Sequence, residues 1–203
     1  MFNKFAITLT VFMLLFGISC SAAAQGKKAS VKTKSSINDL VQKAREGRSA
    51  ADPEIVKMVK NAYSEGQSAE NSFFGNNDIT GTWICDVAAS TGGGAPFGAL
   101  QTFNSDGTFV ETSSLLGYGG EGPAHGVYIR FVGGYLLTFE LFVFDPETGD
   151  SVGRVRVRNF IRLQGNNKLI SYNAVDFIEP DGNEIPDIDS GIYTADRMRV
   201  RGL

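Results

Sequence analysis

The sequence predicts an all-β fold, an eight-stranded antiparallel up-and-down barrel, over residues 78–203. Apolar and polar residues alternate from Ile79 onward with the period of two that strands require, and short turns rich in glycine separate the runs at even spacing. The number of runs is the third observation, because eight up-and-down strands close into a barrel without exposed edges. We expect a signal peptide and two short amphipathic helices before the barrel.

The expected signal peptide spans residues 1–24. Lys4 supplies the positive charge, Phe5–Ile18 is an apolar run too short to cross a bilayer comfortably, and Ala22-Ala23-Ala24 is typical of a cleavage site. This organisation predicts export to the periplasm or to the cell exterior. An uncleaved anchor helix is the alternative.

A second alternative is lipid attachment at Cys20, which would make the protein an envelope lipoprotein. Ser19 supplies the small residue that precedes the cysteine in such signals, whereas Gly17 departs from their pattern. Cleavage after Ala24 leaves Cys85 as the single thiol, so we expect no internal disulfide. Cys85 lies at strand spacing from Trp83, which favours a buried and inert thiol over a nucleophile.

Charge is distributed unevenly along the chain. Residues 25–75 contain nine Lys and Arg against six Asp and Glu, and residues 76–203 contain nine against sixteen. A net-acidic barrel argues against a nucleic-acid partner. Contact with a membrane is expected only through a lipid anchor at Cys20, and the basic start of the mature chain is interpreted as a solvated tail.

Residues 25–77 are interpreted as a flexible linker, over 25–35, followed by two short helices. The first helix begins near Ile37 after a capping-box pattern and ends before Gly47. The second begins at Asp52-Pro53-Glu54, which combines an N-cap, a first-turn proline and an acidic residue, and is expected to end at Gly66. Short helices need a packing surface, so both should lie against the barrel or a partner.

The expected strands share the two-residue alternation and are separated by turn or loop segments. Their ranges are 80–88, 97–103, 108–114, 125–132, 135–144, 152–163, 169–178 and 190–200. Two glycine-rich connections, 91–98 and 117–126, lack the strand-to-helix context of phosphate loops. We interpret them as mobile rims of the barrel.

Gly81-x-Trp83 on the first strand, eight meandering strands and a late arginine on the last resemble the lipocalin or calycin superfamily. Two further runs, 103–112 and 153–158, resemble bacterial secreted lipocalin-like domains of unassigned function. The resemblance implies that Trp83 closes the barrel base together with Gly81, and that Arg197 or Arg199 packs across the indole. An Asp-containing turn typical of the second lipocalin motif is not clear in this sequence.

The charged face of the fifth and sixth strands can be placed by a register argument. If Phe144 opposes Val152 across the turn, then Glu140 opposes Arg156. The opposite face is apolar and should line the barrel interior, which places Arg154, Arg156 and Arg158 outside. In the alternative these arginines point inward and clasp an anionic ligand. Three apolar side chains share the charged face, and the N-terminal helices could cover them: Leu136, Phe142 and Phe160.

The favoured function is binding of a small hydrophobic or amphipathic ligand without catalysis. The expected ligand-binding residues are those of the apolar interior and the rim: Leu137, Phe139, Leu141, Val155, Val157, His125 and Tyr128. One histidine without a fixed partner is poor evidence for a metal or a haem, so no metal and no cofactor are predicted. No oligomeric state follows from the sequence.

Two other functions remain open. A barrel isomerase or cyclase needs inward polar groups, and the strand candidates for that role are Glu111, Tyr128, Asn159, Tyr172 and Asp176. No residue is assigned a catalytic role, because the orientation of these side chains does not follow from the sequence. An envelope interaction module with a fully packed barrel is the third hypothesis, since fifteen phenylalanines can fill a small interior.

Overall fold

The computed structural model describes residues 37–68, 78–87, 97–114, 121–131, 133–145 and 148–199. The chain divides into two compact units, Met1–Lys32 and Thr33–Leu203, and every described residue belongs to the second unit. The expected signal peptide with Cys20, the 25–35 linker and part of both glycine-rich rims lie outside the described residues.

Two helices precede the barrel, α1 over Ile37–Arg45 and α2 over Pro53–Ser68. Asp52 caps α2, because its Oδ1 accepts a hydrogen bond from the Glu54 N–H at 2.8 Å. The expected end of α2 at Gly66 is wrong, since the helix continues to Ser68. Gly66 is buried, and a Cβ there would lie 2.4 Å from Leu136 Cδ1, so this glycine permits close approach to the barrel.

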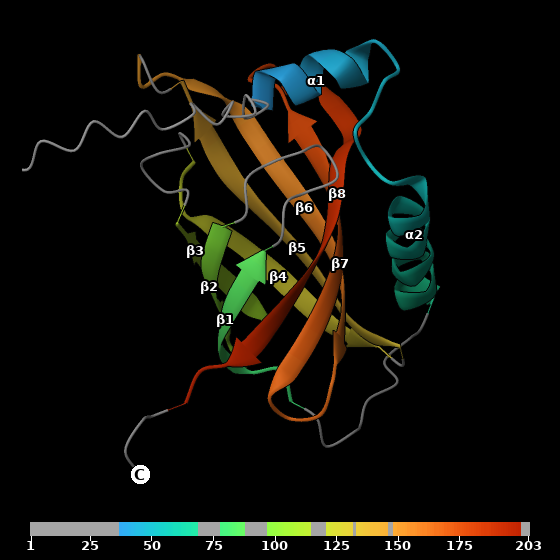
Figure 1. Ribbon diagram of the computed structural model, residues 1–203, viewed down its shortest axis with the longest axis vertical. Coiled ribbons are helices and arrows are strands. Elements are labelled where there is room, and N and C mark those ends of the chain that lie inside the picture. The colour runs from blue at the N-terminus through green and yellow to red at the C-terminus, as the bar shows by residue number, and fades with distance from the viewer. Residues whose placement is uncertain are drawn as a thin grey trace, which may run out of the picture. The chain divides into compact units, whose positions relative to one another are not determined.

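Eight antiparallel strands form a closed barrel in which each strand pairs with the next and β1 pairs with β8, which confirms the predicted fold class (Figure 1). The strands are β1 Gly81–Val87, β2 Phe97–Phe103, β3 Thr108–Ser113, β4 Ala124–Phe131, β5 Gly134–Phe144, β6 Ser151–Leu163, β7 Lys168–Ile178 and β8 Glu184–Arg197. Most bounds lie within one residue of the expected ones.

The start of β8 differs most from expectation, because the strand begins at Glu184 and not at Ser190. A bulge interrupts its alternation: the pairing with β7 shifts between Val175 and Phe177, and Asp187 has a φ of 53°. The side chain of Asp176 stabilises the bulge by accepting a hydrogen bond from the Asp187 N–H at 2.9 Å. Because the bulge interrupts the alternation of apolar and polar residues, the sequence pattern does not indicate the first part of this strand.

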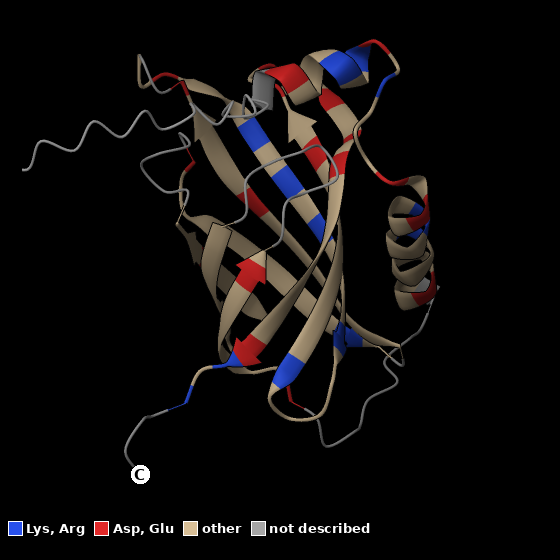
Figure 2. Cartoon of the chain, viewed as in Figure 1, with Lys and Arg blue, Asp and Glu red and all other residues tan. Residues whose placement is uncertain are grey.

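The register of β5 and β6 brings Glu140 opposite Arg156 as expected. The expected pair of Phe144 with Val152 is wrong. Phe144 pairs with Ser151, because the register shifts between Val143 and Phe144 and leaves Val152 as the extra residue in β6. The apolar face of both strands belongs to the main core, and the arginine face is outside. Figure 2 shows this outer face as a row of basic positions along β6 with acidic positions on neighbouring strands.

The indole of Trp83 lies fully buried at the end of the barrel where β1 begins, and its Nε1 donates to the Ile79 carbonyl at 2.8 Å. Arg197, which pairs with Trp83 across β1 and β8, places its guanidinium carbon 4.3 Å from the centroid of the Trp83 ring. Arg199 follows the strand and is exposed. Of the two arginines considered, Arg197 makes the contact.

The helices pack on different parts of the barrel. α2 lies against the outer surface, where Val56, Val59 and Ala62 form a second core with side chains of β5, β6 and β7 (Figure 1). α1 packs against β8, and its Leu40 and Val41 join the main core of the barrel. The apolar side chains Leu136 and Phe160 on the charged face are covered by α2, whereas Phe142 stays exposed.

Candidate functional site

A group of polar side chains lies inside the barrel among apolar neighbours. Its members come from five strands and are all buried: Gln101 on β2, Glu111 on β3, Asn159 on β6, Ser171 on β7 and Tyr193 on β8. Each shares the face of its strand with residues of the main core, which places it inward. We call these five residues the interior polar cluster.

Hydrogen bonds join the cluster across the barrel. Gln101 Nε2 donates to Glu111 Oε2 at 2.6 Å and to Tyr193 Oη at 3.0 Å. On the other side, Ser171 Oγ donates to Asn159 Oδ1 at 3.0 Å. Tyr193 links the two halves, because its hydroxyl lies 3.5 Å from Asn159 Oδ1. The network therefore connects β3 to β7 through the interior.

One donor of the cluster has no acceptor. Asn159 is fully buried, and its Nδ2 is the one buried side-chain nitrogen or oxygen in the described part of the chain without a hydrogen-bond partner. An unsatisfied buried N–H costs about 1–3 kcal/mol, so native proteins keep few of them. Such a group calls for a structural or functional explanation.

Asn173 extends the cluster, because it lies directly opposite Asn159 in the pairing of β6 with β7 and is also buried. Its amide is next to Gly191 of β8: a Cβ at that glycine would lie 3.5 Å from Asn173 Oδ1 and 3.6 Å from Nδ2. Two primary amides thus stand side by side on the inner wall, and the residue beside them has no side chain.

Burial makes the electrostatics of the interior unusual. Desolvation raises the pKa of Glu111 to about 7, and the nearby Glu121 carboxylate raises it further, while the Gln101 hydrogen bond opposes the shift. Desolvation also raises the pKa values of Glu121 and Tyr193. Among the described inward positions of the strands, the cations are Arg130, which lies over the Tyr135 ring, and Arg197, and both are at the Trp83 end. The cluster therefore has no positive counter-charge beside Glu111.

Cys85 also faces the interior and is fully buried. Burial, and after it the Glu111 carboxylate, raises the pKa of its thiol well above the ordinary value. A thiol in this state is a poor nucleophile. The geometry is that of the inert, buried cysteine that the strand spacing predicts.

The structure brings most of the sequence-predicted ligand residues together on the inner wall. Leu137, Phe139, Leu141 and Val155 are buried in the main core, and Val157 packs against it, half-buried. Tyr128 also faces inward, but its hydroxyl donates to the Asn104 carbonyl at 2.6 Å near the Trp83 end. His125 is exposed on the outside, opposite Val110 and Glu140, so it is apart from the others.

The candidates for enzyme chemistry separate in the same way. Glu111 and Asn159 belong to the interior polar cluster, whereas Tyr172 and Asp176 face the helix side of the barrel wall. Sequence reasoning missed three members of the cluster: Gln101, Ser171 and Tyr193. Their signal was present, since each occupies an inward position of its strand's alternation, but it carries no information about their contacts across the barrel.

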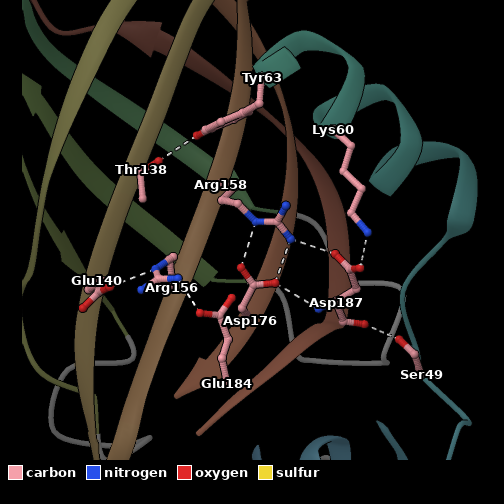
Figure 3. A network of polar contacts seen from close by, with 10 residues as sticks. All are labelled: Ser49, Lys60, Tyr63, Thr138, Glu140, Arg156, Arg158, Asp176, Glu184 and Asp187. Carbon is pink, nitrogen blue, oxygen red and sulfur yellow. Dashed lines mark hydrogen bonds and ion pairs between the residues drawn. The ribbon is translucent and has the colours of Figure 1, made fainter. Parts of the chain in front are cut away.

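The arginines of β6 point outward and are paired with carboxylates. Arg158 donates from Nε and Nη2 to both oxygens of Asp176, at 2.8 and 2.7 Å, and from Nη2 to Asp187 at 2.8 Å (Figure 3). Lys60 of α2 donates to the second oxygen of Asp187 at 2.6 Å. Ser49, between the helices, donates to the Asp187 carbonyl. This network joins the β8 bulge to the helical segment.

The other two arginines of β6 form a more exposed part of the same surface. Arg154 and Arg156 share the Glu140 carboxylate at 2.7 and 2.9 Å, and Arg156 also donates to Glu184 at 2.7 Å. In α2, Tyr63 Oη donates to the Leu137 carbonyl at 2.7 Å and lies 2.9 Å from Thr138 Oγ1 (Figure 3). The Tyr63 contacts hold α2 on the wall. The ion pairs of Arg154 and Arg156 join β6 to β5 and β8 on the outer face of the barrel.

Comparison of the chain with models of protein families, with curated proteins and with solved structures found no match. Within the described ranges, no three His, Cys, Asp or Glu side chains are grouped so that they could hold a metal ion. Neither helix described here has the length and apolar character needed to cross a membrane.

Proposed function

We propose that this protein is an exported, non-catalytic binding protein, which holds a small apolar or amphipathic molecule inside a lipocalin-like barrel of the calycin type. The observation that carries the proposal is the unpaired Nδ2 of Asn159, which belongs to the interior polar cluster and is buried among the apolar side chains of the barrel core. A ligand with a hydrogen-bond acceptor satisfies this donor, and the apolar wall accommodates the rest of the molecule.

The distribution of side-chain size supports binding in the half of the barrel away from Trp83. Aromatic rings fill the half near Trp83: Phe103 lies 5.0 Å from Phe109, which stacks on Phe139 at 5.2 Å. Beyond these rings the inward residues include two small ones, Ala99 and Ala124. Cys85 and Ala195, which are also small, pair with each other one inward step from Trp83 and Arg197. An eight-stranded barrel has room for one small ligand when small residues line part of it.

The position of α1 supports a route of entry at the end opposite Arg197. Leu40 and Val41 of α1 pack into the main core, and Arg45 forms an ion pair with Glu179 in the turn between β7 and β8. The turn between β6 and β7 lies at the other end, where Arg197 Nε donates to the Asn166 carbonyl at 2.8 Å. A ligand would therefore enter beside α1, because the Trp83 end is sealed.

Export is part of the proposal and rests on residues 1–24. The signal-peptide pattern supports the periplasm or the cell exterior, and lipid attachment at Cys20 would instead keep the barrel at the envelope. Replacing Cys20 with serine separates the two locations: a lipoprotein would lose its membrane fraction, and a protein released by cleavage after Ala24 would keep its distribution.

The proposal is tested with N-phenyl-1-naphthylamine, an uncharged apolar fluorophore that accepts energy from tryptophan. Trp83 is the only tryptophan in the chain, so transfer from it reports a probe close to the barrel interior. We expect saturable transfer in the wild type and at least a tenfold weaker affinity in Ala99→Phe, which fills the interior. Val127→Phe is the matched control, because Val127 is exposed on the outer wall.

Melting curves show whether Ala99→Phe is folded, and Ala195→Phe provides a second filled variant if it is not. Equal affinity of the probe for the wild type, a folded filled variant and Val127→Phe would contradict binding inside the barrel. Absence of any saturable transfer in the wild type would contradict it as well.

The packed interaction module is the second candidate, and one observation favours it. The outer face of β1–β4, which the helices leave uncovered, exposes five apolar side chains: Ile84, Leu100, Val110, Val127 and Ile129. Exposed apolar positions grouped on one face mark interaction surfaces. A wild-type barrel that excludes the probe but loses self-association or partner binding on Val127→Asp would favour this function over ligand binding.

A further inference from the structure

Asn159 carries the one buried side-chain donor on the described inner wall that lacks a hydrogen-bond partner, and the amide of Asn173 lies beside it. The two residues are directly opposite each other on β6 and β7. Asn159 Oδ1 already accepts from Ser171, so the free part of this amide is a donor. A molecule that completes the site must therefore present an acceptor to Asn159 Nδ2.

The charged groups near the two amides determine which kind of acceptor group a ligand can place there. Glu111 is linked to Asn159 through Gln101 and Tyr193, and Glu121 adds a second carboxylate near Glu111. The titratable groups that face Glu111 are Glu121, Tyr193 and Cys85, and none of them carries a positive charge. A carboxylate or phosphate head would add a negative charge to this buried setting without a cation to compensate it.

A cationic head is disfavoured at the amides for a different reason. An ammonium group has donors only, and it would meet the N–H of Asn159 with no acceptor to offer. An ester, ketone or amide carbonyl instead accepts from the amide and carries no net charge. The head group that meets these requirements is therefore an uncharged carbonyl group.

We infer that the ligand of this barrel has an uncharged head with a carbonyl acceptor, seated on the side-chain amides of Asn159 and Asn173, and an apolar tail beside the small inward residues Ala99 and Ala124. The inference depends on the proposed binding function. It goes beyond that function by defining the chemical class of the head and the two residues that recognise it.

The experiment compares three molecules that share one alkyl chain and differ only in the head: decanamide, decanoate and decylammonium. Each displaces N-phenyl-1-naphthylamine from the wild type at pH 8. We expect decanamide to displace the probe at a concentration at least tenfold lower than either charged compound. The preference over decanoate should narrow at pH 6, where more of Glu111 is protonated, and should not change with pH in Glu111→Gln.

Two variants assign the recognition to the amides. Asn159→Leu should weaken the binding of decanamide at least tenfold more than it weakens the binding of the probe, and Asn173→Leu should act in the same direction. Asn166→Leu is the control, because Asn166 lies in an exposed turn. Melting curves show whether each variant is folded, and a loss of affinity larger for decanamide than for the probe reports the head group.

The possible outcomes distinguish failure of the head-group inference from failure of the proposed binding function. If the probe binds and decanoate or decylammonium displaces it as well as decanamide, the head-group inference is wrong and the binding function stands. The inference is also wrong if decanamide binds Asn159→Leu and Asn173→Leu as tightly as it binds the wild type. If the probe does not bind the wild type, both proposals are overturned.

Discussion

The guanidinium of Arg197 stacks on the indole of Trp83 at 4.3 Å, and this contact joins the last strand of the barrel to the first. The same guanidinium donates to the carbonyls of Asp78 and Thr80, which lead into β1. Closure of the sheet and sealing of one barrel end therefore depend on the same pair of residues. Under the proposed binding function, we expect the ligand away from this sealed end, at the interior polar cluster.

Loss of the Trp83 side chain should destabilise the barrel strongly. We expect Trp83→Ala to lower the free energy of unfolding by about 3–5 kcal/mol, because a large, fully buried ring is replaced by a cavity. Arg197→Gln should cost about 1–2 kcal/mol through the lost cation–π contact. Urea unfolding followed by circular dichroism measures both, with the exposed Arg199→Gln as the control. Unchanged stability of Trp83→Ala would show that Trp83 does not seal the barrel.

The ion pairs on the outer face of β6 should contribute unequally to the free energy of unfolding. Asp176 is 1% exposed and accepts from Arg158 and from the Asp187 N–H, so Asp176→Asn should lower the free energy of unfolding by about 3 kcal/mol. Arg154 is 43% exposed, and Arg154→Gln should cost less than about 1 kcal/mol. Chemical denaturation of the two variants gives the comparison. Equal effects would contradict the dependence on burial.

Two neighbouring residues of α2 should differ in their effect on stability, because only one of them is buried against the barrel wall. Val59 is fully buried against the wall, whereas its neighbour Met58 is 39% exposed. Val59→Ala should lower the unfolding free energy by about 2 kcal/mol and make the helix more sensitive to limited proteolysis. Met58→Ala should change stability by less than about 0.5 kcal/mol. A helix that is cleaved equally fast in both variants would argue against docking through Val59.

The buried carboxyl of Glu111 makes stability depend on pH. Its pKa is about 7 in the folded protein and 4.5 as the ordinary value, so between these values the folded state holds a proton that the unfolded state has lost. The free energy of unfolding should fall as pH rises from 4.5 to 7, by about 3 kcal/mol from this group, and then become level. In Glu111→Gln this component of the pH dependence should vanish. Parallel stability profiles of the two proteins would contradict it.

The sequence predicts the barrel well because each signal is local. Alternation and turns define seven of the strands, and the pairing of Glu140 with Arg156 follows from counting along a hairpin. The first part of β8 could not be found in the same way, because the bulge at Asp187 breaks the alternation and is stabilised by Asp176 from another strand. A bulge held by a tertiary contact leaves little trace in the local pattern.

The site is only partly visible in the sequence for a related reason. Glu111 and Asn159 were recognisable as polar residues on strands, but their inward orientation depends on which face of each strand is buried. Gln101 and Tyr193 meet only because the barrel closes and brings β2 near β8 across the interior. Contacts across a closed barrel join residues far apart in the chain, and no pattern of spacing encodes them.

The central claim is that the barrel interior binds a small molecule, and intermolecular NOEs test it most directly. In a complex of the isotope-labelled protein with N-phenyl-1-naphthylamine, we predict NOEs from the probe to the methyl groups of Leu141, Val155 and Val157 on the inner wall. NOEs confined to Val127 and Ile129 on the outer wall would contradict the claim, because they would place the probe on the exposed apolar face.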